Sequence, residues 1–191
     1  MPKITVSSLD KVGKSVLDIP IKPLIGNTVK PLRDYVNVKN PKAYLFVNVA
    51  SRWGKTSSNY RELVQMENQY GPKGLQIFAF PCNQFAGQEP GTPEKIAEFA
   101  ERREAKFPFF EKLDVNGAKT HPVYQFLKEN SSLEGEKVPH NFAKFLADAT
   151  GQNITFFKPG INPLKILPDI EPLLKWNSKF GCKLSLHATF W

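Results

Sequence analysis

The chain has 191 residues, which suits one compact domain that buries about two-thirds of its unfolded surface. Its composition, 41% hydrophobic and 23% charged, is ordinary for a globular protein, and no stretch approaches the roughly 20 apolar residues of a membrane span. A net charge of +8 and a pI near 9.4 favour acidic partners, either acidic protein surfaces or anionic membrane; nucleic acid ranks lower, because no phosphate loop, zinc-finger spacing or RNP-like motif accompanies the charge.

The N-terminus and the cysteines predict an intracellular protein. Residues 1–14 contain no apolar core of the kind that a secretory signal needs, and they are expected to form an N-terminal arm. Cys82 and Cys182 are too few for a disulfide framework and fit a reducing compartment, the cytoplasm or the mitochondrion. The three histidines stand at unrelated spacings, so neither a metal site nor a cofactor is expected.

The first half of the chain predicts two central strands separated by a helix. The apolar run 44–50 is short, β-branched and bounded by turn signals, which is typical of a buried strand. Residues 58–70 have a mostly helical period that ends at Gly71 and Pro72, and the run 75–80 predicts a second buried strand. Prolines break the preceding sequence into shorter pieces, which are strands at 18–21 and 28–30 and a helical turn at 32–35.

The second half predicts further alternation and then a hairpin. Thr92 as N-cap and Pro93 at the first helical position predict a helix that runs to about Arg103. His121, directly before Pro122, is expected to cap or pack at another helix start. The remaining predicted pieces are a strand at 107–113, a turn at 116–117, a helix at 121–127, a polar loop at 129–139, hairpin strands at 142–148 and 153–158, and a helix at 163–176.

Strands that alternate with helices, followed by a hairpin and a closing helix, indicate an α/β layer architecture. This order resembles a thioredoxin-like fold with inserts, in which a central mixed β-sheet is flanked by helices. We expect the domain to span residues 15–174, with an N-terminal arm at 1–14 and a C-terminal tail at 175–191.

Four sequence blocks carry the specific signal of this chain. Residues 47–60 read VNVASRWGKTSSNY, and residues 80–91 read FPCNQFAGQEPG. The others are Val115-Asn116-Gly117 with His121-Pro122, and Asn141 to Leu146. In order and spacing these blocks resemble the glutathione peroxidase family, which has N-V-A-S-x-Cys/Sec-G-x-T in the first block and matches the second over its whole length. The short loop at 129–139 is similar to the monomeric, phospholipid-hydroperoxide or plant-like branch, so a homotetramer is not expected.

The resemblance implies a four-residue active site, of which this sequence keeps only two residues. In this family a peroxidatic Cys or Sec at a helix N-terminus attacks the peroxide, while Gln, Trp and Asn side chains donate hydrogen bonds. The Gln corresponds to Gln88 and the Asn to Asn141, whereas the nucleophile position holds Trp53 and the Trp position holds His140. The stretch that matches the resolving cysteine, 99–103, contains no cysteine.

Trp53 cannot replace the nucleophile, because indole offers one N–H donor and no nucleophilic anion near neutral pH. One hypothesis links the two changes: the large indole of Trp53 fills the space of the family's Trp, and the smaller His140 makes room. The other is independent drift after function was lost. His140 as a general base lacks an evident nucleophile.

Cys82 is the possible remaining redox residue of the domain. It lies at the end of a predicted strand beside the Gln88 loop, which allows residual thiol chemistry near the vacated site. The other interpretation treats Cys82 as a small, buried hydrophobic residue.

Three functions remain open from the sequence. The favoured one is a glutathione-peroxidase-like protein without peroxidase activity, acting as a structural or interaction subunit of a larger assembly. The N-terminal arm and the basic, aromatic tail 175–191 would then be its docking segments. The second is an active thiol- or glutathione-dependent lipid hydroperoxide peroxidase, either through Cys82 or because selenocysteine has been written as Trp53. The third is a basic module that binds membrane or nucleic acid surfaces.

Overall fold

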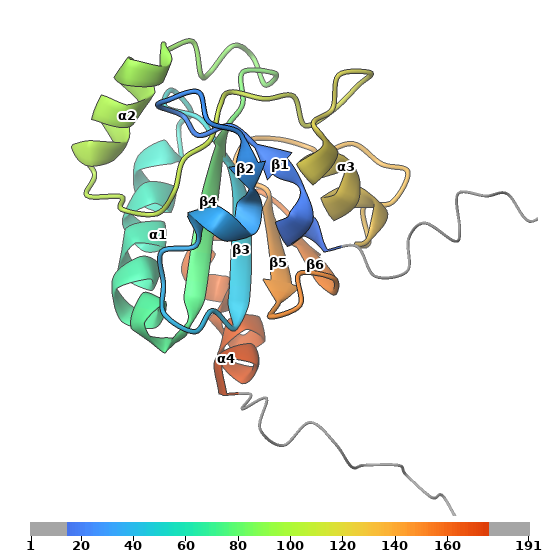
Figure 1. Cartoon of the computed structure of the whole chain (residues 1–191). Helices are drawn as coiled ribbons and strands as arrows, with labels where there is room; N and C mark the ends of the chain where they lie inside the picture. Colours follow the sequence, from blue (N-terminus) through green and yellow to red (C-terminus); the bar gives the residue numbers. More distant parts are fainter. Residues whose placement is uncertain (1–14, 176–191) are drawn as a thin grey trace, which may run out of the picture.

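The computed structural model describes residues 15–175, which form a mixed β-sheet covered by helices (Figure 1). The sheet has four strands in the order β4-β3-β5-β6. The central strand β3 is parallel to β4 and antiparallel to β5, and β5 pairs antiparallel with β6. The bounds are β3 (Ala43–Val49), β4 (Leu75–Pro81), β5 (Lys144–Asp148) and β6 (Ile154–Phe157). A separate antiparallel pair joins β1 (Pro20–Ile21) to β2 (Lys30–Pro31).

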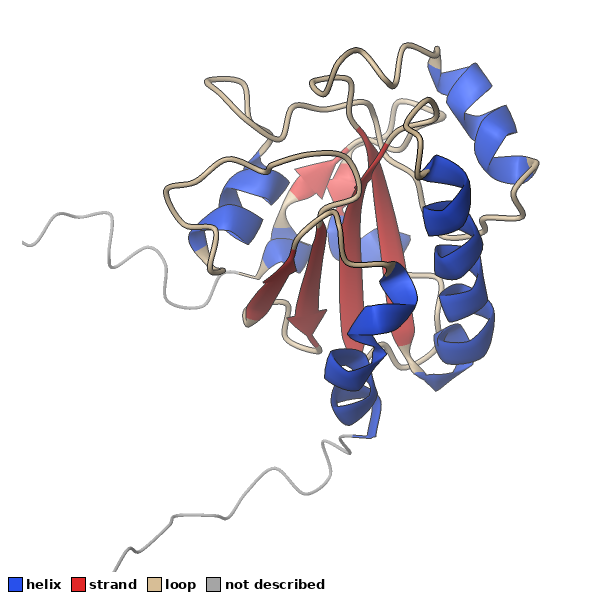
Figure 2. Ribbon diagram, turned by 180° about the vertical axis from the view of Figure 1, so that it is seen from behind, coloured by secondary structure: helices blue, strands red, loops and turns tan. Residues whose placement is uncertain are grey.

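Helices cover both faces of this sheet. On one face lie α1 (Thr56–Tyr70) and α4 (Leu167–Lys175); in Figure 2, α4 stands in front of the lower ends of the strands and α1 stands to their right. The opposite face is covered by α3 (Pro122–Glu129) and the segment before β1. The helix α2 (Pro93–Glu101) lies beyond the upper end of α1 in Figure 1. The predicted thioredoxin-like α/β architecture is therefore confirmed.

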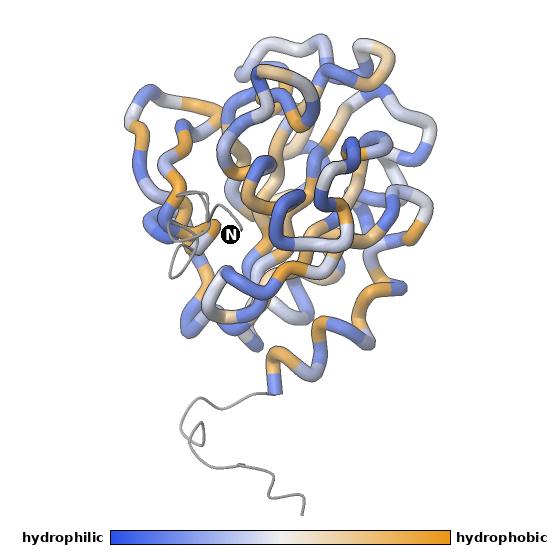
Figure 3. The backbone as a smooth tube through the Cα atoms, turned by 90° about the vertical axis from the view of Figure 1, so that its right-hand side faces the viewer, coloured by the Kyte–Doolittle hydropathy of each residue, from blue (hydrophilic) through white to orange (hydrophobic). Residues whose placement is uncertain are grey.

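The central strand is buried on both sides because its side chains alternate between two cores. Tyr44 and Phe46 belong to the core under α3, whereas Leu45, Val47 and Val49 belong to the core under α1 and α4. A strand buried on both faces reads as a continuous apolar run, which is why the sequence identifies it so clearly. Figure 3 colours the backbone by the hydropathy of each residue, with hydrophobic stretches running through the middle of the domain.

The structure confirms the N-cap residues predicted for α2 and α3. The Thr92 side chain accepts a hydrogen bond from the backbone N–H of Lys95 at 3.4 Å, with Pro93 as the first helical residue. His121 caps α3 in the same way, since its Nδ1 accepts from the N–H of Val123 at 3.2 Å. Short 3-10 turns fill the remaining connections, namely η2 (Val16–Asp18), η3 (Leu32–Tyr35), η4 (Gly71–Lys73) and η5 (Pro163–Ile166).

The strand predicted at 107–113 is wrong. This segment runs beside the outer edge of β4 but makes only isolated bridges, Phe109 to Ala79 and Phe110 to Pro23. Pro108 supplies a carbonyl to the N–H of Ala79 at 3.0 Å but has no N–H of its own to continue a ladder.

Two further differences concern the ends of the domain. The last predicted helix, 163–176, is divided into the 3-10 turn η5 and the helix α4. The expected N-terminal arm, 1–14, and all of the expected tail except Lys175 lie outside the described residues. Within residues 15–175, no helix is both long and apolar enough to cross a membrane.

Candidate functional site

The candidate site lies where β3 ends and α1 begins. Thr56, the first residue of α1, closes the intervening loop: its hydroxyl donates to the carbonyl of Ala50 at 2.7 Å and accepts from the N–H of Trp53 at 3.1 Å. The N-cap residue Lys55 provides no side-chain cap, and the first turn of α1 contains no acidic residue. The N-terminus of a helix carries partial positive charge, so this junction favours an anion over a neutral group.

Trp53 packs its indole ring inward from this loop. The ring centroid lies 5.3 Å from that of His140 and 5.5 Å from that of Phe142, with the Phe142 ring nearly parallel to the indole. Trp53 is half-buried and packs against the core under α1 and α4. The indole–imidazole contact is the geometry that the packing hypothesis for Trp53 and His140 requires.

His140 joins Trp53 to a further aromatic side chain, and we call the rings of Phe85, His140, Trp53 and Phe142 the ring stack. Its imidazole stacks on Phe85 at 5.3 Å between centroids, on the loop that follows β4. Its Nδ1 accepts from the backbone N–H of Asn141 at 2.8 Å, which holds the imidazole in one orientation. The imidazole thus acts as a spacer between Phe85 and Trp53.

Gln88 and Asn141 are brought together, as the resemblance implied. The Asn141 amide nitrogen donates to the Gln88 Oε1 at 2.7 Å. The Gln88 carbonyl also accepts from the N–H of Arg52 at 3.0 Å, which ties this loop to the one that carries Trp53. The Asn141 Oδ1 is buried without a hydrogen-bond partner, so one polar atom of this pair is left unsatisfied.

The backbone next to Asn141 is held in an uncommon conformation. Phe142 has a φ of +60°, which non-glycine residues rarely adopt. Two hydrogen bonds from β3 support it: the Phe142 N–H donates to the Asn48 carbonyl at 2.7 Å, and the Asn48 amide donates to the His140 carbonyl at 3.0 Å. These hydrogen bonds hold the strained backbone of Phe142 in place, and in this conformation the Phe142 ring packs against Trp53.

A buried carboxyl lies beneath the site. Glu89 is fully buried; its Oε1 accepts from the Ser51 hydroxyl at 2.7 Å, while its Oε2 has no hydrogen-bond partner. Burial raises the pKa of this carboxyl, and the Ser51 hydrogen bond partly opposes the shift. Glu89 follows Gln88 directly, so its main effect is to anchor the loop that carries Gln88.

The structure places Cys82 and Trp53 against different cores. Cys82 is fully buried and packs in the core under α3, whereas Trp53 packs against the core on the other face of the sheet. Burial raises the pKa of the Cys82 thiol to about 11, so near neutral pH it is a thiol and not a nucleophilic thiolate. Within residues 15–175, no group of three or more His, Cys, Asp or Glu side chains gathers to hold a metal ion.

Comparison with known proteins identifies the family. The glutathione peroxidase family model matches residues 23–128. The chain belongs to the glutathione peroxidase family.

Named relatives agree with this assignment. A probable mitochondrial phospholipid hydroperoxide glutathione peroxidase of Arabidopsis thaliana is 46% identical over 163 residues, which is 84% of this chain and 68% of that protein. A similar protein of Mesembryanthemum crystallinum is 45% identical over 84% of this chain and 93% of its own length. Among solved structures, T. cruzi GPX1 has a TM-score of 0.66 and 34% identity, covering 84% of this chain and 97% of that one.

More distant structures support the fold alone. A thioredoxin-family thiol:disulfide interchange protein from Chlorobium tepidum TLS is only 10% identical, yet it has a TM-score of 0.59.

Sequence reasoning missed the contribution of neighbouring residues to the glutathione-peroxidase-like site. Phe85 and Phe142 complete the ring stack, and both lie inside blocks that identify the family, although neither had been assigned a contact. Glu89 lies in a segment that the sequence predicted as a loop, and no pattern in that loop indicated a buried carboxyl.

Proposed function

We propose that this member of the glutathione peroxidase family has lost peroxidase turnover and acts as a structural or interaction subunit of a larger assembly. The observation that carries the proposal is the packing of the Trp53 indole between His140 and Phe142, at the junction where the family places its reactive chalcogen. A side chain without a nucleophilic anion removes the covalent route to peroxide reduction and does not merely slow it.

The remaining thiol in the described domain supports the proposal. The nucleophile in this chemistry is the thiolate, and Cys82 is buried, has a raised pKa and packs on the other face of the sheet from Trp53. The Gln88–Asn141 pair remains, but its donors then have no reacting sulfur or selenium to orient. We therefore regard Trp53, Gln88, His140 and Asn141 as a vestigial site.

One alternative has a specific observation in its favour. The named relatives include several called phospholipid hydroperoxide glutathione peroxidase, at about 45% identity. An active enzyme of that class would need either selenocysteine at position 53 in the cell or thiol chemistry at Cys82. His140 argues against the first route, because a misread codon at 53 does not explain a second change in the same site.

We also propose an intracellular location. Two relatives carry names that place them in the mitochondrion and the chloroplast of Arabidopsis thaliana, and both are 46% identical to this chain. The chain has two cysteines, Cys82 and Cys182, too few for a disulfide framework, and this fits a reducing compartment. Fractionation of native cells with an antibody to this chain tests the location, and recovery from the medium would contradict it.

The peroxidase question needs protein whose residue 53 has been verified by mass. The assay follows consumption of hydrogen peroxide and of a phospholipid hydroperoxide, with glutathione or thioredoxin as reductant. Trp53→Cys and the double variant Trp53→Cys/His140→Trp are the matched gain-of-function controls. We expect no turnover above background from the native chain and measurable turnover from the double variant.

A further inference from the structure

A basic pocket lies between α1 and the end of α2, apart from the ring stack of Trp53. It has a volume of about 580 Å³ and a floor formed by the buried side chain of Val64. Its polar lining consists of Ser57, Arg61, Arg102, Arg103 and Glu104. Three guanidinium groups against one carboxylate leave the lining with an excess of two positive charges.

Arg103 is held in place before any ligand arrives. Its guanidinium lies 3.5 Å from the centroid of the Phe99 ring and 5.7 Å from that of Tyr60, both cation–π contacts. Its Nη1 also donates to the Phe99 carbonyl at 3.4 Å. A guanidinium fixed in this way loses little freedom on binding an oxyanion, which favours recognition of carboxylate groups.

The other two arginines are exposed beside it. Arg102 forms an ion pair with Glu98 at 2.6 Å, one turn earlier on α2. Both side chains of that pair are more than half exposed, and such pairs contribute little, so Arg102 can exchange this partner for another carboxylate at small cost. Arg61 reaches the pocket from α1, so the arginines come from two elements.

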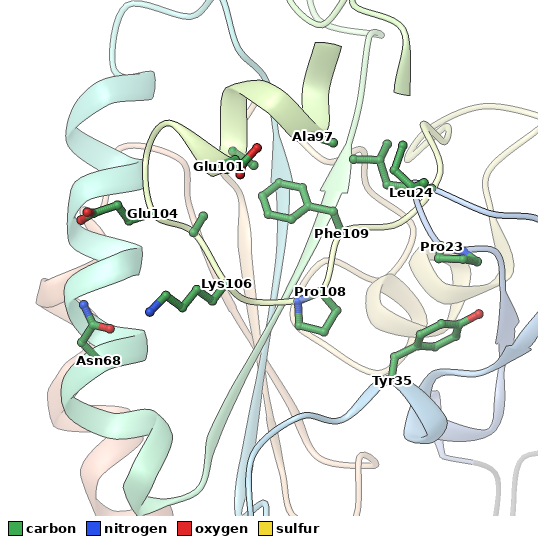
Figure 4. Close-up of a pocket in the computed structure, with 13 residues that line it drawn as sticks. Pro23, Leu24, Tyr35, Asn68, Ala97, Glu101, Glu104, Lys106, Pro108 and Phe109 are labelled. Carbon is green, nitrogen blue, oxygen red and sulfur yellow. The ribbon is translucent and has the colours of Figure 1, made fainter. Parts of the chain in front are cut away.

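A largely apolar groove, shown in Figure 4, shares Glu104 with the basic pocket. The groove has a volume of about 670 Å³ and runs between α2, residues 104–109 and the loop at 23–25. Its apolar lining includes Leu24, Ile25, Ala97, Pro108 and Phe109. Ile25, which lines the groove, is 56% exposed.

We propose that the basic pocket and the apolar groove form one docking surface for a partner protein, which inserts apolar side chains into the groove and acidic side chains among the arginines. An apolar centre bordered by arginine is typical of protein–protein interfaces, and a small anion would use only the basic half. The excess positive charge selects an acidic partner. This inference rests on the proposed function, since it names the surface through which that interaction would occur.

The test uses a synthetic peptide of sequence EELFEE and the full-length protein labelled with ¹⁵N. We expect backbone amide shifts confined to residues 23–25, 57–68 and 97–109, which include most of the lining of the pocket and the groove. The peptide KKLFKK, which keeps the apolar centre and reverses the charge, is expected to leave these residues unchanged. The variant Arg61→Glu/Arg102→Glu should weaken EELFEE binding by about fivefold or more. The control variant Lys119→Glu/Lys137→Glu makes the same change in net charge at exposed lysines elsewhere and should bind as the native chain does.

Each other outcome overturns the proposal. Equal weakening in both variants would mean attraction to the overall positive charge. Equal binding of both peptides would mean an apolar site without charge selection. Tighter binding of inorganic phosphate or of a short oligothymidylate at the same residues would assign the surface to a phosphate ligand. An absence of shifts would show that this surface does not bind an acidic partner. The proposed loss of turnover would be unaffected, because the peroxidase assay tests it independently.

Discussion

At the scale of single residues, Trp53 contributes a packed aromatic ring at the position where the family has its nucleophile. The ring contacts His140 and Phe142, so truncation to alanine removes two aromatic contacts from a half-buried position. We expect Trp53→Ala to lower the free energy of unfolding by about 2 kcal/mol, less than full burial would give. Val29→Ala, at a side chain that is 58% exposed, is the control and should change it by less than about 0.5 kcal/mol.

Urea denaturation of both variants measures this difference. If Trp53→Ala proved as stable as the native chain, the indole would not be a packing element, and the hypothesis that links it to His140 would fail.

Lys144 gives a second prediction at the residue scale. Its side chain is fully buried, and its ammonium group donates to the Ile161 carbonyl at 2.5 Å. Burial lowers the pKa of Lys144 to about 8, whereas the unfolded chain keeps the ordinary value near 10.5. Between these values the unfolded state binds more protons than the folded state, so this residue makes stability rise with pH across that window.

Lys144→Met removes this titration. We expect the native chain to gain stability relative to Lys144→Met between about pH 8 and pH 10.5, by a few kcal/mol at most. Urea midpoints of the two proteins, measured at matched pH, report the difference. Parallel pH profiles would show that Lys144 titrates as an exposed lysine does.

At the scale of elements, the turn between β5 and β6 is fastened to the start of the domain. Gly151 has a φ of +68°, and a Cβ added there would lie 2.4 Å from the Ser15 hydroxyl. The Ser15 hydroxyl itself donates to the Thr150 carbonyl at 2.7 Å, so it cannot move away freely. We expect Gly151→Ala to destabilise the fold by more than about 2 kcal/mol, through both the backbone strain and the clash.

Gly117→Ala separates these two causes. Gly117 has a φ of +84°, but an added Cβ there would meet nothing within 4 Å. It should therefore show the backbone strain alone, about 1 kcal/mol. Equal thermal shifts of the two variants would mean that the contact between the turn and Ser15 contributes nothing.

The sequence predicted correctly the strands that are buried on both faces. It was less informative for a segment whose structure depends on how it pairs with a neighbouring strand. The runs at 44–50 and 75–80 became β3 and β4 because strands buried on both faces have an unambiguous pattern. The segment 107–113 has a similar pattern, but Pro108 lacks the N–H that would continue a ladder with β4.

The candidate site was also only partly readable. The motifs placed Gln88 beside Asn141, as the structure does. They did not show that Cys82 and Trp53 face different cores, because this depends on which face of the sheet each side chain meets. The basic pocket brings together arginines about forty residues apart in the sequence, and no local spacing indicates such a cluster.

At the scale of the whole molecule, the proposal predicts that the chain does not act alone. Gel filtration of native extract, detected with an antibody to this chain, should place it in a species well above the 21.6 kDa of the free chain. The docking surface predicts that Arg61→Glu/Arg102→Glu shifts it toward the free position, while Lys119→Glu/Lys137→Glu does not. Elution of the native protein as a free monomer would contradict the role in an assembly.

We propose that the packed rings of Trp53, His140 and Phe142 occupy the position where the family has its reactive peroxidase site. The most direct test measures peroxide consumption by the native protein, with glutathione and with thioredoxin, after the mass of the peptide containing residue 53 has been determined. We expect tryptophan at 53 and no turnover above background, with turnover gained in Trp53→Cys/His140→Trp. Turnover by protein with a verified Trp53, or selenocysteine at that position in native protein, would contradict it.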